Sequence, residues 1–468
     1  MRGTPPRYHI ARMASLPTPA ISGIADFIAD PVSAANFPEH RLRFRNDRAA
    51  ASVGLDGLGE AEWVDHFGRF VPLPGNLPQP LALRYHGHQF RVYNPDIGDG
   101  RGFTFAQLRD DKGRLLDLGT KGSGTTPYSR FGDGRLTLKG GVREVLATEM
   151  LDALGVNTSK SFSLIETGEH LHRGDEPSPT RSAVLVRLSH GHIRIGSFQR
   201  LGALGLTGEM ERLVRYVLEN LYSEAPGDEP ATQLFTHVVQ RSAVLAASYM
   251  AAGFVHGVLN SDNINITAES FDYGPWRFTP FWDERFTAAY FDQQGLYAFG
   301  RQAQAIHWDV VQLAIALAKL VPVEALAPIL DTFPELYEKA IVAAILKRLG
   351  VVPRGDEADL ALMQAIERGL SARTVEIDRF FFDWAGGRRR GLSPMDAEYA
   401  AHFTDLEGML AGYAPARSTD HPYWADAAPC SMHIAEVEAI WAPIAEADDW
   451  ERFHTKIAAI RRMGEAHR

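Results

Sequence analysis

Short apolar segments alternate with charged or glycine breaks in the first part of the chain, a pattern typical of antiparallel strands. The runs FTFAQL, from Phe103, and RLLDL, from Arg114, show it first. Two more strand-like runs follow, SFSLIE from Ser161 and SAVLVRLS from Ser182. We therefore predict a small antiparallel sheet built from these runs.

One helix interrupts the strands, and helices dominate after about Gly205. Between Lys139 and Leu154 the apolar residues are spaced three and four apart, as on one face of a helix, and Gly155 closes the segment. Further helical segments are predicted at Met210–Leu221, Thr232–Ala252 and Trp308–Leu320, and over most of the chain to Arg468. The pattern indicates an α+β fold, with a strand-rich lobe followed by a helical lobe.

The chain before this sheet has a different character. It is rich in proline, alanine and short polar breaks, as in LPTPAISG and VPLPGNLPQP, which predicts an extended leader crossing the surface of a larger unit. We therefore expect a leader at residues 1–80, a first lobe at 81–205 and a helical lobe at 206–468.

Composition and charge narrow the classes of function. The 468 residues are 45% hydrophobic and 23% charged, as in soluble globular proteins, and contain no run of 18 apolar residues. A net charge of −10 argues against a general nucleic-acid binder. Cys430 is the only cysteine, which excludes an intrachain disulfide and a zinc site built from several cysteines. Because no secretory signal is recognisable, we expect a cytoplasmic protein with neither nucleic acid nor membrane as partner.

The most informative motif is HGVLNSDN, from His256 to Asn263, followed by the tripeptide DYG from Asp272. Protein kinases place a catalytic loop H-R-D-x-x-x-x-N before D-F-G, and its asparagine and the second aspartate bind metal ions on ATP. The separation of histidine and asparagine is the same here, seven residues. Val258 stands where kinases have their catalytic aspartate and cannot accept a proton. Asp262 is a carboxylate that can act instead.

Asn263 and Asp272 together offer the ligands that Mg²⁺ or Mn²⁺ requires. Such a site needs a carboxylate and a neutral amide oxygen, while phosphate and water complete it. A plain turn, with side chains that satisfy local backbone groups, is the alternative interpretation of the segment around Asn263. The tripeptide DYG at a short distance favours the metal site.

Lys121 and Glu144 form a second pair with a counterpart in kinases. Lys121 ends the strand-like run LLDLGTK, and Glu144 lies 23 residues later on the amphipathic helix. Kinases use a strand lysine and a helix glutamate to hold an ammonium group near the phosphates. Alone, the two residues would be read as solvated surface charges. Together with the downstream loop, they favour an ATP site.

Two glycine turns and two arginines complete the candidate chemistry. The turn Gly98-Asp-Gly-Arg-Gly102 precedes the first strong strand, and Gly132-Asp-Gly-Arg135 leads into the predicted helix. Glycines let backbone N–H groups approach an anion closely, although a tight turn alone would also explain them. Arg187 and Arg194, on either side of SHGHI, carry guanidinium groups that suit phosphate oxygens, or they are ordinary surface arginines.

Taken in order, RYHGHQF, IGDGRG, TKGSGTTPYSRFGDGR, GGVRE, RLSHGHIR, HGVLNSDNINI and DYGP resemble the motifs of the selenoprotein O family, the SelO-type pseudokinases. The resemblance covers about Leu81 to Leu320. It implies a two-lobed, protein-kinase-like fold and a protein adenylyltransferase. Such an enzyme binds ATP in a flipped orientation, transfers AMP to Ser, Thr or Tyr hydroxyls of proteins, itself among them, and releases pyrophosphate.

The resemblance also implies roles for the residues that match its motifs. Asp262 would accept the proton of the attacking hydroxyl. Lys121, held by Glu144, would contact the terminal phosphates. Asn263 and Asp272 would bind the metal ion. The nucleotide pocket would be lined by Gly98, Gly100, Arg101, Asp133, Gly134, Arg187 and Arg194.

The chain departs from this family in several places. Arg91 stands where members commonly have glycine, Gly119-Thr120 interrupts the predicted strand before Lys121, and the C-terminal third matches poorly. Many members end in a redox-active selenocysteine or cysteine motif, whereas this chain ends in MGEAHR. We expect the nucleotide chemistry without that redox element.

Two other functions stay open on the residues alone. One is a kinase that transfers the γ-phosphoryl group of ATP with Asp262 as a displaced base. The other is a non-catalytic scaffold that binds a nucleotide and docks partners through its helical lobe. The position of label transferred from ATP separates both from an adenylyltransferase.

Overall fold

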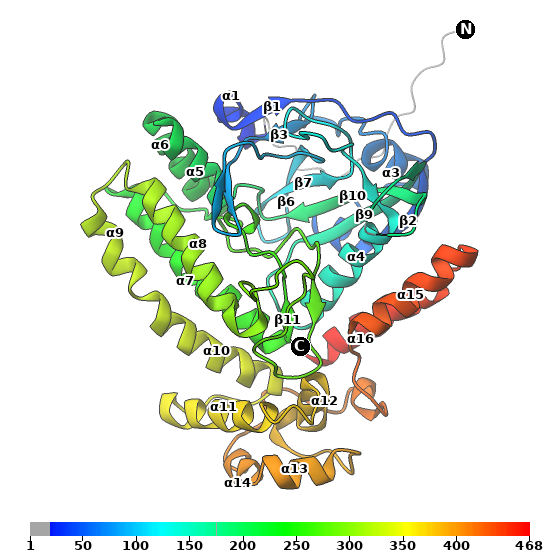
Figure 1. The fold of residues 1–468 in the computed structure, drawn as a ribbon, viewed down its shortest axis with the longest axis vertical. Coiled ribbons are helices and arrows are strands. Elements are labelled where there is room, and N and C mark those ends of the chain that lie inside the picture. The colour runs from blue at the N-terminus through cyan, green and yellow to red at the C-terminus, as the bar shows by residue number, and fades with distance from the viewer. Residues whose placement is uncertain (1–18, 175) are drawn as a thin grey trace.

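An antiparallel sheet of eight strands forms the upper half of the computed structural model, which describes residues 19–174 and 176–468 (Figure 1). The strands lie in the order β1-β3-β6-β7-β10-β9-β2, and β8 also pairs with β10. Their bounds are Ala29–Pro31 (β1), Arg41–Arg45 (β2), Leu81–Leu83 (β3), Thr104–Arg109 (β6), Leu115–Lys121 (β7), Leu136–Thr137 (β8), Lys160–Leu171 (β9) and Thr180–Ser189 (β10).

The four strand runs predicted from the sequence are confirmed as β6, β7, β9 and β10, the centre of this sheet. The predicted break at Gly119-Thr120 is wrong, because β7 continues through both residues and every one of its side chains is buried. Glycine is required at position 119 for packing: a Cβ there would lie 2.5 Å from the ring of His192. The strand therefore delivers Lys121 at its end as a regular ladder residue, paired with Leu185.

The predicted amphipathic helix is confirmed as α4, Leu138–Ala153, which lies against the sheet (Figure 1). The hydroxyl of Thr137 accepts a hydrogen bond from the backbone N–H of Gly140 at 3.1 Å and caps the first turn. Val142, Val145 and Leu146 are fully buried in the core between helix and sheet. This packing fixes the helix that carries Glu144.

The described part of the segment before Leu81 joins the same sheet. It contributes β1 and β2 at the two edges, together with helices α1 (Ala25–Ile28), α2 (Asp47–Ser52) and α3 (Glu60–Phe67). Trp63 of α3 stacks on Phe162 of β9 with ring centroids 4.9 Å apart. The predicted leader thus contains regular elements packed on the sheet, and its residues 1–18 lie outside the described residues.

Helices make up most of the chain from Ile195 onward (Figure 1). The predicted helix at Thr232–Ala252 is confirmed as α7, and the one at Trp308 begins six residues earlier, at Gln302. The segment predicted as a helix at Met210–Leu221 is α6 followed by a π-helical turn at Val217–Leu221. The bounds are Ile195–Leu204 (α5), Thr207–Tyr216 (α6), Pro230–Ala252 (α7), Gln302–Leu317 (α8), Val323–Leu330 (α9), Phe333–Leu349 (α10), Asp356–Leu370 (α11), Ile377–Asp383 (α12), Asp396–His402 (α13) and Leu406–Leu410 (α14).

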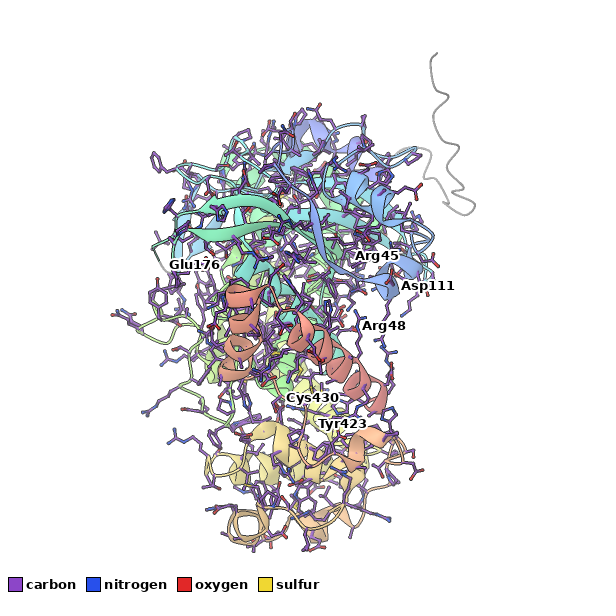
Figure 2. All side chains as sticks on the ribbon, turned by 90° about the vertical axis from the view of Figure 1, so that its right-hand side faces the viewer. Arg45, Arg48, Asp111, Glu176, Tyr423 and Cys430 are labelled. Atoms are coloured by element: carbon purple, nitrogen blue, oxygen red, sulfur yellow. The ribbon has the colours of Figure 1, made fainter. Side chains whose placement is uncertain are left out.

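The last two helices, α15 (Ile434–Ala447) and α16 (Glu451–Ala466), return to the sheet-bearing half and lie beside α4 (Figure 1). Cys430 precedes them, partly buried next to Tyr423, whose hydroxyl accepts a hydrogen bond from the Cys430 backbone N–H at 3.2 Å (Figure 2). Within residues 19–174 and 176–468, none of the helices has the length and apolar character needed to cross a membrane. The fold is thus a mixed one, an antiparallel sheet with many helices.

Candidate active site

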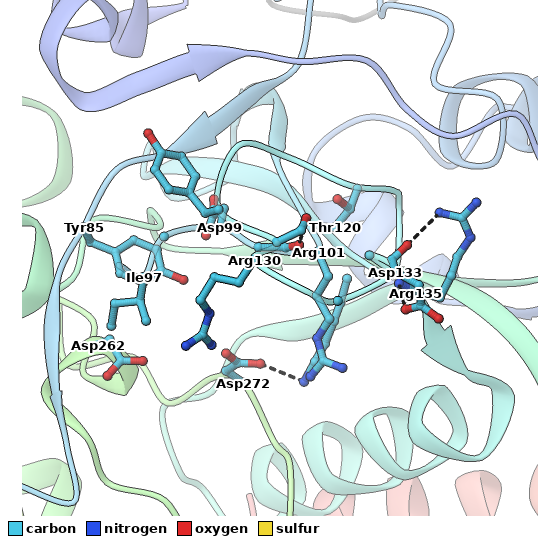
Figure 3. Close-up of a pocket in the computed structure, with 18 of the residues that line it drawn as sticks. Tyr85, Ile97, Asp99, Arg101, Thr120, Arg130, Asp133, Arg135, Asp262 and Asp272 are labelled. Atoms are coloured by element: carbon cyan, nitrogen blue, oxygen red, sulfur yellow. Dashed lines mark hydrogen bonds and ion pairs between the residues drawn. The ribbon is translucent and has the colours of Figure 1, made fainter. Parts of the chain in front are cut away.

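A cavity of about 610 Å³ lies where the sheet meets the loops that precede α8, and it collects most of the predicted site residues (Figure 3). Glu144 and Asn263 are not among the residues that line it. Those that do line it are Gly98, Gly100, Arg101, Lys121, Asp133, Gly134, Arg187, Arg194, Asp262 and Asp272. Motifs spread over about 175 residues of sequence therefore meet at one place.

Lys121 is held between two carboxylates at the inner wall of this cavity. Its ammonium group forms an ion pair with Glu144 of α4 and another with Asp272, the latter at 2.7 Å. The Glu144 side chain is 1% exposed and the Lys121 side chain 5%, so Glu144 lies behind the lysine and not in the cavity. The predicted ion pair between Lys121 of the strand and Glu144 of the helix is therefore present, and the buried ammonium group of Lys121 lines the cavity.

Asp272 presents an ionised carboxylate to the same cavity. Burial alone would raise its pKa, but the positive charges of Lys121, Arg187 and Arg101 outweigh burial and hold the pKa well below its usual value. The nearest guanidinium nitrogen of Arg187 is 3.4 Å from the carboxylate. The backbone of Asp272 is left-handed, with φ +63°, which turns the chain sharply at this residue.

His256 supports the segment that carries Asp272. Its Nε2 lies 3.0 Å from the carbonyl oxygen of Phe271, so this nitrogen carries the proton and donates it. Its backbone N–H donates to the side chain of Gln302 in α8. Burial lowers the pKa of His256 and keeps the ring neutral. The histidine of the motif therefore positions the metal-binding candidate and has no contact with the cavity.

Asp262 lies in a short 3-10 turn, Ser261–Asn263, that one other segment supports. The hydroxyl of Ser261 accepts a hydrogen bond from the backbone N–H of His88 at 2.8 Å, and the side chain of Asn260 accepts one from Phe90 at 3.0 Å. Both donors belong to or follow strand β4, Gly87–Gln89, within the motif RYHGHQF. That motif thus fixes the turn.

Glycine at position 87 makes room for the Asp262 carboxylate. A Cβ at this position would lie 2.7 Å from Oδ1 of Asp262, closer than real contacts allow. The same Oδ1 is buried and has no hydrogen-bond partner among the described residues. Burial, opposed by the charge of Arg194, raises the pKa of Asp262 to about 6. Asp262 therefore lines the cavity as a carboxyl group with a raised pKa and one buried oxygen that lacks a hydrogen-bond partner among the described residues.

Asn263 is oriented by its own turn. Its side-chain Nδ2 donates to the carbonyl oxygen of Val258 at 3.0 Å, which leaves the amide oxygen free to act as a ligand. Within residues 19–174 and 176–468 no three His, Cys, Asp or Glu side chains are grouped as a metal cage. A carboxylate from Asp272 and an amide oxygen from Asn263 suit a cation that takes its other ligands from phosphate and water. The donors present fit Mg²⁺ or Mn²⁺.

The two glycine turns form one wall of the cavity. Gly134 has φ +69°, and a Cβ there would lie 2.2 Å from the backbone of Gly124. The second glycine turn is therefore in direct backbone contact with the loop that follows β7. A Cβ on Gly98 would lie 2.4 Å from the ring of Tyr128. Asp133 is held by Arg173 in an ion pair of 2.8 Å (Figure 3). These glycines permit close packing of the wall.

Arg187 and Arg194 both lie at the cavity floor, almost fully buried. Arg194 donates to the backbone carbonyl oxygen of Asp262 at 3.0 Å and contacts the Asp99 carboxylate at 3.3 Å. Both guanidinium groups lie over the ring of Phe271, at 4.8 Å for Arg194 and 5.6 Å for Arg187. They are built into the site and are not ordinary surface arginines.

The sequence matches a family of known proteins. The family model described as "Protein adenylyltransferase SelO" matches residues 13–403. The chain belongs to the SelO family. A relative from Synechocystis sp., named "Protein nucleotidyltransferase YdiU", is 42% identical over 95% of this chain and 97% of its own length. A relative of the same name from Gloeobacter violaceus is 44% identical over 95% of this chain and 94% of its own.

Membership of the SelO family establishes the class of enzyme, a protein adenylyltransferase, and with it ATP as substrate and proteins as acceptors. The match to the family also extends further than the motifs indicated. We expected a resemblance over Leu81 to Leu320 and a poor match in the C-terminal third, but the family model begins at residue 13 and ends at 403, and the relatives align with 95% of the chain.

Several residues that line the cavity of this SelO-family chain were not predicted from the sequence. Tyr85 lies within RYHGHQF, Asp99 within the first glycine turn and Arg130 just before the second, so the motifs themselves signalled them. Arg173 had no such signal. It lies in the loop after β9 and reaches the cavity through its ion pair with Asp133, 40 residues earlier in the sequence.

Proposed function

We propose that this chain transfers AMP from ATP to Ser, Thr or Tyr hydroxyls of proteins and releases pyrophosphate. The observation that carries the proposal is the juxtaposition of two unlike carboxylates in one basic cavity. Asp272 is ionised by neighbouring cations, whereas Asp262 has a pKa of about 6. Pairs of carboxyl groups whose environments separate their pKa values are typical of sites with distinct acid–base roles.

Asp262 is the base in this proposal. At neutral pH its carboxylate is ionised and accepts the proton of the attacking hydroxyl. The bond from the hydroxyl oxygen to the α-phosphorus forms as the bond to the bridging oxygen of pyrophosphate breaks. Arg194, bonded to the backbone of Asp262, holds the turn in place during this step. Lys121 and Arg187 stabilise negative charge on the phosphates.

Asn263 and Asp272 would hold the divalent metal ion, which would neutralise phosphate charge when bound. The fit of their donors, an amide oxygen and an ionised carboxylate, supports this assignment. Glu144 keeps Lys121 in position from behind, and Gly98, Gly100, Arg101, Asp133 and Gly134 form the nucleotide-binding wall. The backbone N–H groups of glycine turns suit phosphate oxygens.

A two-lobed, protein-kinase-like arrangement is part of the same proposal. The sheet with α4 would be the first lobe, within residues 81–205, and the helices of 206–468 the second, with the cavity between them. What supports it is the set of kinase-like features at the cavity: the pair Lys121 and Glu144, the loop from His256 to Asn263, and Asp272. Residues 19–80, the described part of the predicted leader, would be an addition to the first lobe.

The position of label in the product tests the proposed chemistry. Incubation with ATP labelled at the α-phosphate should label acceptor protein, including the chain itself, and ATP labelled at the γ-phosphate should not. Mass spectrometry should find an added AMP. Label from the γ-phosphate would support the kinase alternative, and ATP binding without any transfer would support the scaffold.

A further inference from the structure

A second cavity, of about 560 Å³, adjoins the nucleotide cavity. Arg101, Lys121, Arg135 and Arg173 line both, so the two cavities meet along these four cations. Seven cationic side chains and three carboxylates line the second cavity, in a chain whose net charge is −10. Such a local excess of positive charge favours an anionic ligand.

Arg143 and Arg277 are the distinctive pair of this second cavity. Both are partly buried, and both donate to one acceptor, the carbonyl oxygen of Trp276, at 3.0 and 2.9 Å. Neither forms an ion pair with any carboxylate in the part of the chain that the structure describes. Burial, together with the charge of Arg277, lowers the pKa of Arg143 to about 10.

The carboxylates that act on this pair are already paired with other cations: Glu144, which acts on Arg143, forms an ion pair with Lys121. Glu438 of α15 is a carboxylate close to both arginines, but it is already in an ion pair with Lys139 at 2.8 Å. The first turn of α4, which includes Gly140, also lines the cavity and contains no acidic residue. A helix N-terminus carries partial positive charge, so it adds to the field of the arginines.

We propose that the second cavity binds inorganic pyrophosphate after it leaves ATP. This inference rests on the adenylyl transfer proposed above. Pyrophosphate is small and carries several negative charges, as the uncompensated guanidinium pair requires. It would be released beside Lys121 and Arg101, the cations that both cavities share. The second cavity thus gives the product a binding place next to the nucleotide cavity.

The exposed aromatic residues at the rim present a competing occupant. Tyr290 is 84% exposed and Phe291 46%, and both line the second cavity. Aromatic and arginine side chains together are common where proteins dock. The uncompensated charge, however, lies inside, on Arg143 and Arg277, and is continuous with the phosphate-binding cations. This placement favours a product of the reaction over an acceptor protein.

The test measures the binding of pyrophosphate to the full chain by calorimetry. The nucleotide cavity is first saturated with an ATP analogue that carries a methylene group between the α- and β-phosphates. This analogue cannot release pyrophosphate. Wild-type protein should bind pyrophosphate in addition to the analogue. Arg143→Gln and Arg277→Gln should each weaken that binding about tenfold, the effect expected for loss of one charge-assisted contact. Affinity for the analogue should not change.

Arg212→Gln is the control, because Arg212 is exposed and pairs with Asp26 away from both cavities. The guanidinium group of Arg143 packs over the ring of Trp276 at 4.8 Å, so its replacement removes a packing contact. Circular dichroism must therefore show that each variant is folded. Arg277→Gln is the second variant, which leaves this contact in place. Failure of pyrophosphate to bind beside the analogue would overturn the proposal, as would equal losses of the affinities for pyrophosphate and for the analogue. These measurements need no AMP transfer, so a failure of the proposed function would appear separately, in the labelling experiment.

Discussion

In the proposed mechanism the chemistry depends on Asp262, whose surroundings differ from those of Asp272 in the same cavity. Its burial favours the neutral form and raises its pKa to about 6, whereas Asp272 is ionised by the cations around it. Val258, at the position of the kinase base, contributes only its carbonyl oxygen, which orients Asn263. In the proposed mechanism Asp262 thus takes over, from a different position, the role of the acid that kinases carry where this chain has Val258.

The pKa of Asp262 predicts a pH dependence. A carboxyl group with a pKa of about 6 is protonated below that pH and cannot act as a base. We expect kcat/KM for AMP transfer to be constant above pH 7 and to fall about tenfold for each pH unit below 6. Steady-state rates between pH 5 and 8 measure this. A rate that increases as the pH falls would contradict the role of Asp262.

Gly87 is predicted to be indispensable for the position of that carboxylate. In Gly87→Ala the new Cβ would meet Oδ1 of Asp262, which must move. We expect the transfer rate to fall at least about tenfold, since small displacements of reacting groups are costly, while ATP affinity is retained. Gly57→Ala is the control, because no atom lies within 4 Å of a Cβ there. Equal activity of both variants would show that the turn tolerates the shift.

At the scale of elements, strand β7 contains a glycine, Gly119, and still ends in a residue of the site, Lys121. Gly119 allows the buried ring of His192 to pack on the strand, and His192 in turn donates its backbone N–H to Asp117 at 3.0 Å. The strand, although it contains a residue of low strand propensity, is held from both sides by β6 and β10. Its last residue is Lys121.

Gly119→Ala should therefore destabilise the protein. The added Cβ would overlap the His192 ring, which is buried and cannot move away freely, and overpacking of this kind costs about 1–3 kcal/mol. The unfolding midpoint in urea measures the loss. Gly208→Ala, in α6 with no atom near its added Cβ, should be neutral or stabilising. An unchanged midpoint for Gly119→Ala would mean that His192 repacks at no cost.

The elements that the sequence predicted correctly are the long ones with a clear apolar period, the central strands and α4, because burial of one face decides them. The hairpin of β4 and β5 (Val92–Asn94) was missed, since strands of three residues are too short to show an apolar period. Within the site, motif spacing found Lys121, Asp262 and Asp272. It could not find Arg173, which a loop brings to the cavity through tertiary contacts only.

At the scale of the whole molecule, the C-terminal helices stabilise the catalytic half. Arg461 of α16 forms a bidentate ion pair with Glu149 of α4, with both nitrogen–oxygen distances 2.7 Å. Both side chains are largely buried, at 23% and 11% exposed. Because Glu149 and Glu144 lie on the same helix, α16 supports from outside the element that holds Lys121.

Loss of this contact should lower the stability of the fold. Arg461→Ala would leave Glu149 without its partner in a largely buried place, and we expect a loss of about 1–3 kcal/mol, reduced by partial exposure to solvent. Chemical denaturation followed by circular dichroism measures it. Lys339→Ala, which breaks the exposed pair with Glu335, is the control and should change nothing measurable. Similar behaviour of the two variants would show that the contact of α16 with α4 contributes little.

The most direct test of the central claim, that this SelO-family chain transfers AMP with Asp262 as base, is a paired measurement on Asp262→Asn. The rate of transfer from α-labelled ATP and the affinity for ATP are measured on the same preparation as wild type. Transfer should fall by about 10²–10⁴-fold, the usual contribution of a general base, while ATP affinity is kept. In Asp272→Ala, both should be lost. Undiminished transfer by Asp262→Asn would contradict the account.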